Sequence, residues 1–154
     1  HASPSDPNFY DDDPFKHALG RLIDERQPRL VLDIHASRAS RPWHVDVGTM
    51  RGRSLLGQPE LRATLFDALR AEGLVRLSQD YFPAAKQRTV TRYAAARGVP
   101  ALQLEINVTL LGPHRDATAA DDFARTLNAL TRYLVAIDAC MPQASTCPVF
   151  APTD

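Results

Sequence analysis

The sequence lacks an excess of charge of either sign, long apolar runs and common nucleotide-binding motifs. Its 18 Lys and Arg residues balance 18 Asp and Glu residues. Non-specific nucleic-acid binding needs a clustered basic surface, so nucleic acid is not expected as a partner. No run of about 18 apolar residues occurs, so neither a spanning segment nor a membrane partner is predicted. The glycines of residues 46–52 form neither a P-loop nor a dinucleotide fingerprint, and no Gly-x-Ser-x-Gly elbow is present.

Cysteine is also scarce. The two cysteines, Cys140 and Cys147, stand in a Pro-rich tail over residues 139–154. A disulfide closing this short loop would fit an exported protein, and two free thiols would fit a cytosolic one almost as well. The tail slightly favours a periplasmic or secreted location over a cytoplasmic one, although no signal peptide is visible.

What is present is enough for a folded core. The 154 residues are 44% hydrophobic, which suits a single domain over residues 1–154. Asp13 and Pro14 predict a helix start, and Gly73 predicts a helix end. The predicted helices cover residues 14–27, 59–72 and 89–97, and a last helix carries an apolar stripe of Phe123, Leu127, Leu130, Leu134 and Ile137.

Short apolar runs between these helices predict strands. They cover residues 30–35, 43–47, 74–77 and 101–107. The run at 30–35 is typical of a strand that is buried on both faces. Strands that alternate with helices predict an α/β fold with a mainly parallel, mixed sheet flanked by helices.

Polar residues at the ends of two strands are the candidate site, because open α/β sheets place their sites at the carboxyl ends of strands. One end carries Asp33 and His35. The other carries Gln103, Glu105 and Asn107, which share one face of the strand. A carboxylate there is costly to bury unless it is paired or used.

A histidine and a glutamate on neighbouring strand ends suit metal-assisted hydrolysis. The imidazole would bind zinc, and the carboxylate would take a proton from water. The alternative is structural: His35 would cap a strand, and Glu105 would pair with an arginine.

The order of motifs favours the first possibility. Four segments occur in a recognisable order: 31–37 (VLDIHAS), 46–54 (DVGTMRGRS), 91–100 (TRYAAARGVP) and 102–107 (LQLEIN). Their order and approximate spacing resemble those of the N-formylglutamate amidohydrolase family. The resemblance covers roughly residues 14–111 and extends more vaguely through the last helix.

This resemblance implies a zinc-carboxypeptidase-like fold and hydrolysis of an amide such as that of an N-formyl amino acid, a small molecule, or of a peptide. His35 would be a zinc ligand and Glu105 the general base or acid. Arg92 would hold a substrate carboxylate, because a guanidinium group can donate two hydrogen bonds to a carboxylate. Arg88 and Arg38 are the second choices for this role. Asn107 is also expected to contact the substrate.

The sequence departs from the family pattern at the remaining metal ligands. A catalytic zinc needs three protein ligands, and the family's early His-x-x-Glu is absent here. We expect either that the chain is the carboxy-terminal part of a larger hydrolase domain, with further ligands outside it, or that it is a degenerate relative. His44 and His114 are weaker candidates for the missing metal ligands, and His17 is expected to face solvent.

Two functions therefore stay open. The chain is either a zinc-dependent amidohydrolase or a non-catalytic domain of the same fold that binds a small carboxylate. The oligomeric state is not predicted by the sequence.

Overall fold

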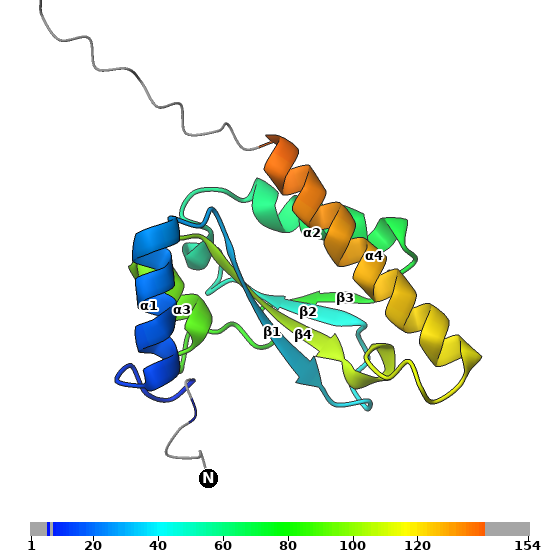
Figure 1. The fold of residues 1–154 in the computed structure, drawn as a ribbon. Helices are drawn as coiled ribbons and strands as arrows, with labels where there is room; N and C mark the ends of the chain where they lie inside the picture. Colours follow the sequence, from blue (N-terminus) through cyan, green and yellow to red (C-terminus); the bar gives the residue numbers. More distant parts are fainter. Residues whose placement is uncertain (1–5, 7, 141–154) are drawn as a thin grey trace, which may run out of the picture.

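The computed structural model describes residues 6 and 8–140 of the chain. In these residues, helices and strands succeed one another along the chain (Figure 1). The elements are α1 (Pro14–Arg26), β1 (Val31–Ser37), β2 (Val45–Gly48), α2 (Glu60–Ala71), β3 (Leu77–Gln79), α3 (Val90–Ala96), β4 (Ala101–Asn107) and α4 (Ala117–Cys140), with 3₁₀ turns η1 (Arg53–Leu55) and η2 (Val108–Leu110). Cys147 and most of the Pro-rich tail lie outside the described residues.

The four strands form one mixed sheet in the order β1-β4-β2-β3. β1 runs parallel to β4 and β2 parallel to β3, whereas β2 and β4 are antiparallel. The predicted α/β class with a mainly parallel sheet is therefore confirmed. The register places His35 of β1 opposite Glu105 of β4, and Asp46 of β2 opposite Glu105 from the other side.

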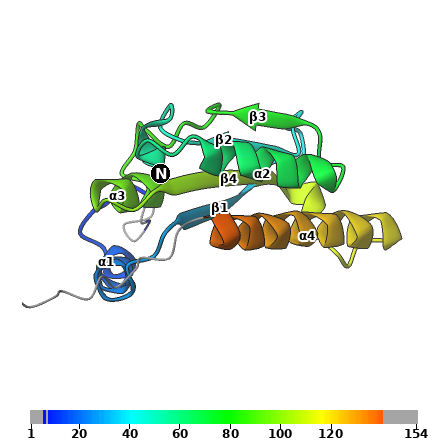
Figure 2. The ribbon, with the colours of Figure 1, turned by 90° about the horizontal axis from the view of Figure 1, so that it is seen from above.

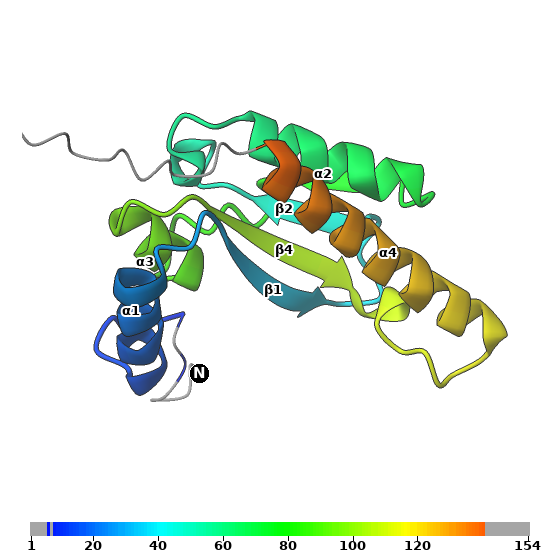
Figure 3. The same cartoon turned by 45° about the horizontal axis from the view of Figure 1, so that its top comes forward.

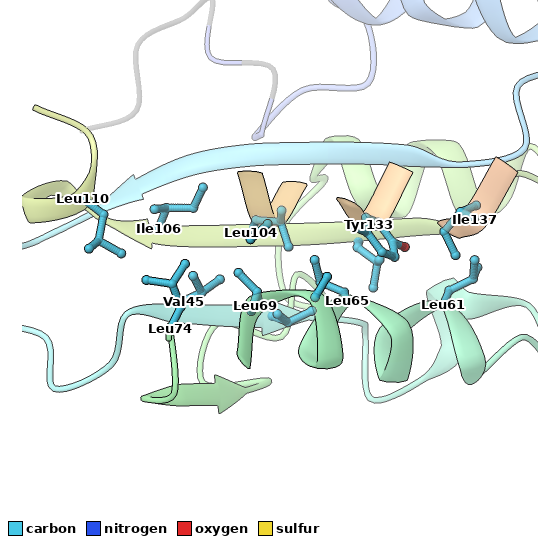
Figure 4. Close-up of a cluster of buried hydrophobic side chains, with 14 of the residues drawn as sticks. Val45, Leu61, Leu65, Leu69, Leu74, Leu104, Ile106, Leu110, Tyr133 and Ile137 are labelled. Carbon is cyan, nitrogen blue, oxygen red and sulfur yellow. The ribbon is translucent and has the colours of Figure 1, made fainter. Parts of the chain in front are cut away.

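One face of the sheet carries the main core. α2 and α4 lie along this face, as Figures 2 and 3 show from two directions. Because side chains alternate across a strand, β4 turns its leucines and Ile106 to the helices and its polar residues to the other face. Figure 4 shows the resulting cluster, whose members include Val45, Leu65, Leu69, Leu104, Ile106 and Tyr133.

On the opposite face, α1 and α3 cover the beginning of β1 and β4. There Ile23 of α1 and Ala94 of α3 pack with Ala101 in a second, smaller cluster. α1 approaches α3 closely because Gly20 has no side chain: a Cβ at this position would lie 2.6 Å from the Tyr93 hydroxyl. Further along the same face lie His35 and Glu105, beyond the two helices.

A buried lysine fixes the segment that precedes α1. Lys16 is 0% exposed. Its ammonium donates to the Tyr10 carbonyl at 2.7 Å, to Asp11 Oδ1 at 3.0 Å and to the Arg88 carbonyl. A buried ammonium requires such complete pairing. Lys16 thereby links residues 10–11 to the loop before α3.

Most of the predicted helix ends are correct. Asp13 caps α1 by accepting from the amide of Phe15 at 2.8 Å, and Thr89 caps α3 by accepting from the amide of Arg92 at 3.1 Å. Gly73 follows α2 with φ 76°. No helix in the described part of the chain combines the length and apolarity needed to cross a bilayer.

Three details of the prediction are wrong. β1 is not buried on both faces: it stands at the edge of the described sheet, and Ile34 is 53% exposed. The strand predicted at residues 74–77 begins only at Leu77, because Leu74 closes the turn after α2 and enters the core. In the apolar stripe of α4, Leu127 and Leu134 are 54% and 51% exposed. Ala129 and Tyr133 face the core instead, since the small alanine admits close packing.

Candidate active site

His35 and Glu105 line one cavity. They are register partners on the parallel strands β1 and β4, so their side chains leave the same face of the sheet next to each other. The cavity above them has a volume of about 700 Å³, which is the size of a small-molecule site. Its wall includes Asn8 and Phe9 from the segment before α1 and the loop at residues 80–87.

Asp33 positions the His35 ring. Its Oδ1 lies 2.8 Å from His35 Nε2, and its Oδ2 accepts from the amide and the hydroxyl of Thr91, both at 3.2 Å. Asp33 is buried. A carboxylate on one ring nitrogen sets the tautomer and leaves the other nitrogen, Nδ1, to act as acceptor or ligand.

The pKa values of His35 and Glu105 are both raised. The hydrogen bond to Asp33 is the largest cause for His35; burial opposes it, and the charges of Asp33, Glu105 and Asp6 add to it. Burial is the largest cause for the raised pKa of Glu105, partly offset by His35 and by a hydrogen bond from Gln103. A carboxylate with a raised pKa is a better proton acceptor than an exposed one.

Asp33→Asn is expected to lower the pKa of His35, because it removes the charge that stabilises the imidazolium. The measurement is an NMR titration of the His35 ring in both proteins. In the wild type, the folded pKa lies above the ordinary value of 6.5. The stability that protonation contributes is therefore complete below pH 6.5 and is lost as pH rises through the folded pKa. An unchanged His35 pKa in the variant would contradict the assigned contact.

The DVGT segment holds the loop that walls the cavity. The carboxylate of Asp46, fully buried, accepts from the amides of Tyr81 and Phe82 at 3.3 and 2.9 Å. Thr49 donates from its amide to Asp80 Oδ1 at 2.7 Å. Charged acceptors make these bonds strong. Through these hydrogen bonds, the DVGT segment attaches the loop 80–83 to β2.

The predicted substrate-binding arginines are not lining residues of the cavity. Arg38 and Arg92 are exposed, and Arg88 pairs with Asp11 at 3.2 Å. None of the three is among the lining residues. Their proposed contact with substrate stays a prediction, and the described geometry does not support it.

Asn107 is a structural residue of the loop after β1. Its amide donates to the carbonyls of Arg41 and Trp43, each at 3.2 Å, and its oxygen accepts from the amide and hydroxyl of Thr109. It is also buried. The side chain therefore braces this loop, and a substrate contact would require these bonds to break.

The other histidines do not join the pair. His44 accepts weakly from the amide of Arg76 at 3.4 Å, and burial lowers its pKa. His17 is exposed beside Asp12, as expected, and His114 is exposed. The structure brings none of them to the cavity lining.

The lysine and the arginine of the cavity lining were not predicted from the sequence as site residues. Arg51 and Lys86 line the cavity from separate loops. Arg51 stands in the 46–54 motif, but nothing in that motif distinguishes it from Arg53 as a cavity residue, and Lys86 lies in none of the four motifs.

The described residues do not complete a zinc site. They contain no group of three or more His, Cys, Asp or Glu side chains that could hold a metal ion. His35 itself suits a ligand, because a carboxylate on the second ring nitrogen is typical of metal-binding histidines. One ligand is nevertheless short of the three that a catalytic zinc requires.

Comparison with known proteins agrees with the motif order. Searches of curated proteins and of solved structures returned no match. The family model for N-formylglutamate amidohydrolase matches residues 9–112, which is more than half of the chain and contains both β1 and β4. The chain belongs to the N-formylglutamate amidohydrolase family.

Proposed function

We propose that this family member hydrolyses the amide of an N-acyl amino acid, such as an N-formyl group, with Glu105 as the proton acceptor for the attacking water. The observation that carries the proposal is the juxtaposition of His35 and Glu105 in one small-molecule-sized cavity. The family match supports the hydrolase class.

The surroundings of Glu105 suit proton transfer. Gln103 donates to Oε1 at 3.1 Å, and in the described part of the chain Oε2 has no hydrogen bond, so it can face water. Burial raises the Glu105 pKa. Glu105 accepts a proton from water as the water oxygen bonds to the amide carbonyl carbon. It returns this proton to the amine nitrogen as the C–N bond breaks, which releases the acid and the amine.

We further propose zinc as the cofactor, with His35 Nδ1 as one ligand and the remaining ligands outside the described residues. Bound zinc would supply a positive charge that acidifies water. The support is the Asp33–His35 hydrogen bond, which leaves Nδ1 available.

His35→Ala tests this proposal. Hydrolysis of N-formyl-L-glutamate and zinc binding are measured on the full chain by product assay and isothermal titration. We expect hydrolysis to be lost and zinc affinity to fall by more than the roughly 10- to 100-fold that an outer hydrogen-bond partner is worth.

The matched control is His44→Ala, because His44 is also partly buried but does not line the cavity. It should leave both measurements within about twofold, as for a substitution away from the site. Equal zinc affinity in wild type and His35→Ala would contradict the ligand assignment. Ligand binding without turnover or metal dependence would favour the non-catalytic carboxylate-binding domain.

A further inference from the structure

Two exposed cationic side chains line the cavity and have no partner among the residues that the structure describes. Neither the Arg51 guanidinium nor the Lys86 ammonium forms a hydrogen bond or ion pair within the described ranges, although both line the cavity with Glu105. Asp80 also lines it, but its oxygens already accept from the amide and hydroxyl of Thr49 and from the Arg51 amide. The Asp80 carboxylate is thus engaged with other donors.

The backbone that presents Arg51 is held in an unfavourable conformation. Met50 and Arg51 have φ values of 51° and 57°, and Gly52 has φ 86°. This left-handed region is unfavourable for residues other than glycine. The amide of Met50 donates to the Pro83 carbonyl at 2.8 Å, and that of Gly52 to the Thr49 hydroxyl at 2.9 Å. These bonds fix the turn at the rim of the cavity, and strain retained at such a position is typical of a functional site.

Other cations near the cavity are already used. Arg41 stacks on Trp43, Tyr81 and Phe82, with its guanidinium carbon 5.0–5.5 Å from their ring centres. Arg88 pairs with Asp11. Among the described lining residues, Arg51 and Lys86 are therefore the side chains that offer positive charge to a ligand.

We infer that Arg51 and Lys86 bind the free carboxylate of the substrate while its amide lies at Glu105. This inference rests on the proposed function. The two cations select substrates that are anionic at neutral pH, and Phe9 and Phe82 in the same lining offer apolar surface for the carbon chain between the charged group and the amide.

The test compares an acid with its neutral form. The values of kcat/KM are measured for N-formyl-L-glutamate and for its diamide, in wild type, Arg51→Gln and Lys86→Gln. Arg51→Gln should lower kcat/KM for the acid about 10- to 100-fold, chiefly through KM, and should change the value for the diamide little. Lys86→Gln should act in the same direction. Arg21→Gln removes an equal charge on the exposed side of α1 and should alter neither value.

A second readout separates this inference from the proposed function. Binding of N-formyl-L-glutamate is measured by calorimetry in each protein without turnover, using the Glu105→Gln background. Weaker binding on loss of Arg51 or Lys86 supports the carboxylate site even when the wild type hydrolyses nothing. Equal losses for acid and diamide, or unchanged binding in both variants, overturn the inference while leaving the hydrolase proposal to its own test.

Discussion

Glu105→Gln is expected to lower the hydrolysis of N-formyl-L-glutamate by about 10²- to 10⁴-fold and, at the same time, to stabilise the fold. The rate falls because an amide cannot accept the proton from water, and general base catalysis contributes a factor of this size. Glutamine keeps the size of the side chain and can still accept the hydrogen bond from Gln103. The measurements are steady-state kinetics with zinc supplied and urea unfolding of both proteins.

The gain in stability follows from the sign of the pKa shift. Burial raises the folded pKa of Glu105 above its ordinary value of 4.5. Ionisation therefore costs the folded state more than the unfolded one, and wild-type stability falls as pH rises from 4.5 through the folded pKa. Above this window the glutamine variant should have the higher free energy of unfolding. Below pH 4.5 the two proteins should converge.

Glu60→Gln is the matched control. Glu60 is exposed in the first turn of α2, where a charge interacts favourably with the helix dipole, so its neutralisation should slightly lower stability and leave turnover unchanged. Near-normal turnover in Glu105→Gln would show that Glu105 is not the proton acceptor of the reaction. A loss of stability on this substitution would show instead that the ionised carboxylate is a structural group.

Gly48→Ala is expected to cost about 3 kcal/mol of unfolding free energy, the upper end of the usual range for overpacking. A Cβ at position 48 would lie 2.3 Å from the carbonyl oxygen of Phe82. Because this atom belongs to the backbone, the loop at residues 80–83 must move as a whole. The bonds that the amides of Tyr81 and Phe82 donate to Asp46 should weaken, and the cavity wall should shift. Urea unfolding gives the cost, and hydrogen exchange at the Phe82 amide reports the loop.

Gly57→Ala separates steric contact from backbone preference. Gly57 has φ +84°, and a Cβ at this position would meet no atom within 4 Å. Alanine there should therefore cost about 1–2 kcal/mol through conformation alone. Exchange at Phe82 should stay as in the wild type. Equal hydrogen exchange at the Phe82 amide in Gly48→Ala and wild type would mean that the hydrogen bonds from the DVGT segment do not hold the loop 80–83 in place.

The sequence predicted the candidate pair because its signals are local. His35 and Glu105 each lie near the carboxyl end of an apolar strand, and the surrounding motifs follow the family order. The two cationic side chains of the cavity lining, Arg51 and Lys86, were not predictable in this way. Arg51 and Lys86 are 35 positions apart in loops. Arg51 lies in the 46–54 motif beside Arg53, and the motif does not mark which of the two arginines lines a cavity. Arg92, chosen from its motif, is exposed and outside the cavity lining.

By itself, the sequence determined the α/β class, the ends of the first three helices and the strands that carry His35 and Glu105. These features depend on caps, glycine stops and short-range periodicity, which act within a few residues. Only the tertiary structure decided which face of α4 enters the core, that β1 stands at the edge of the described sheet, and that Asp46 holds the loop at Phe82. Those outcomes depend on contacts between residues far apart in the chain, where strand register and packing volume set the partners.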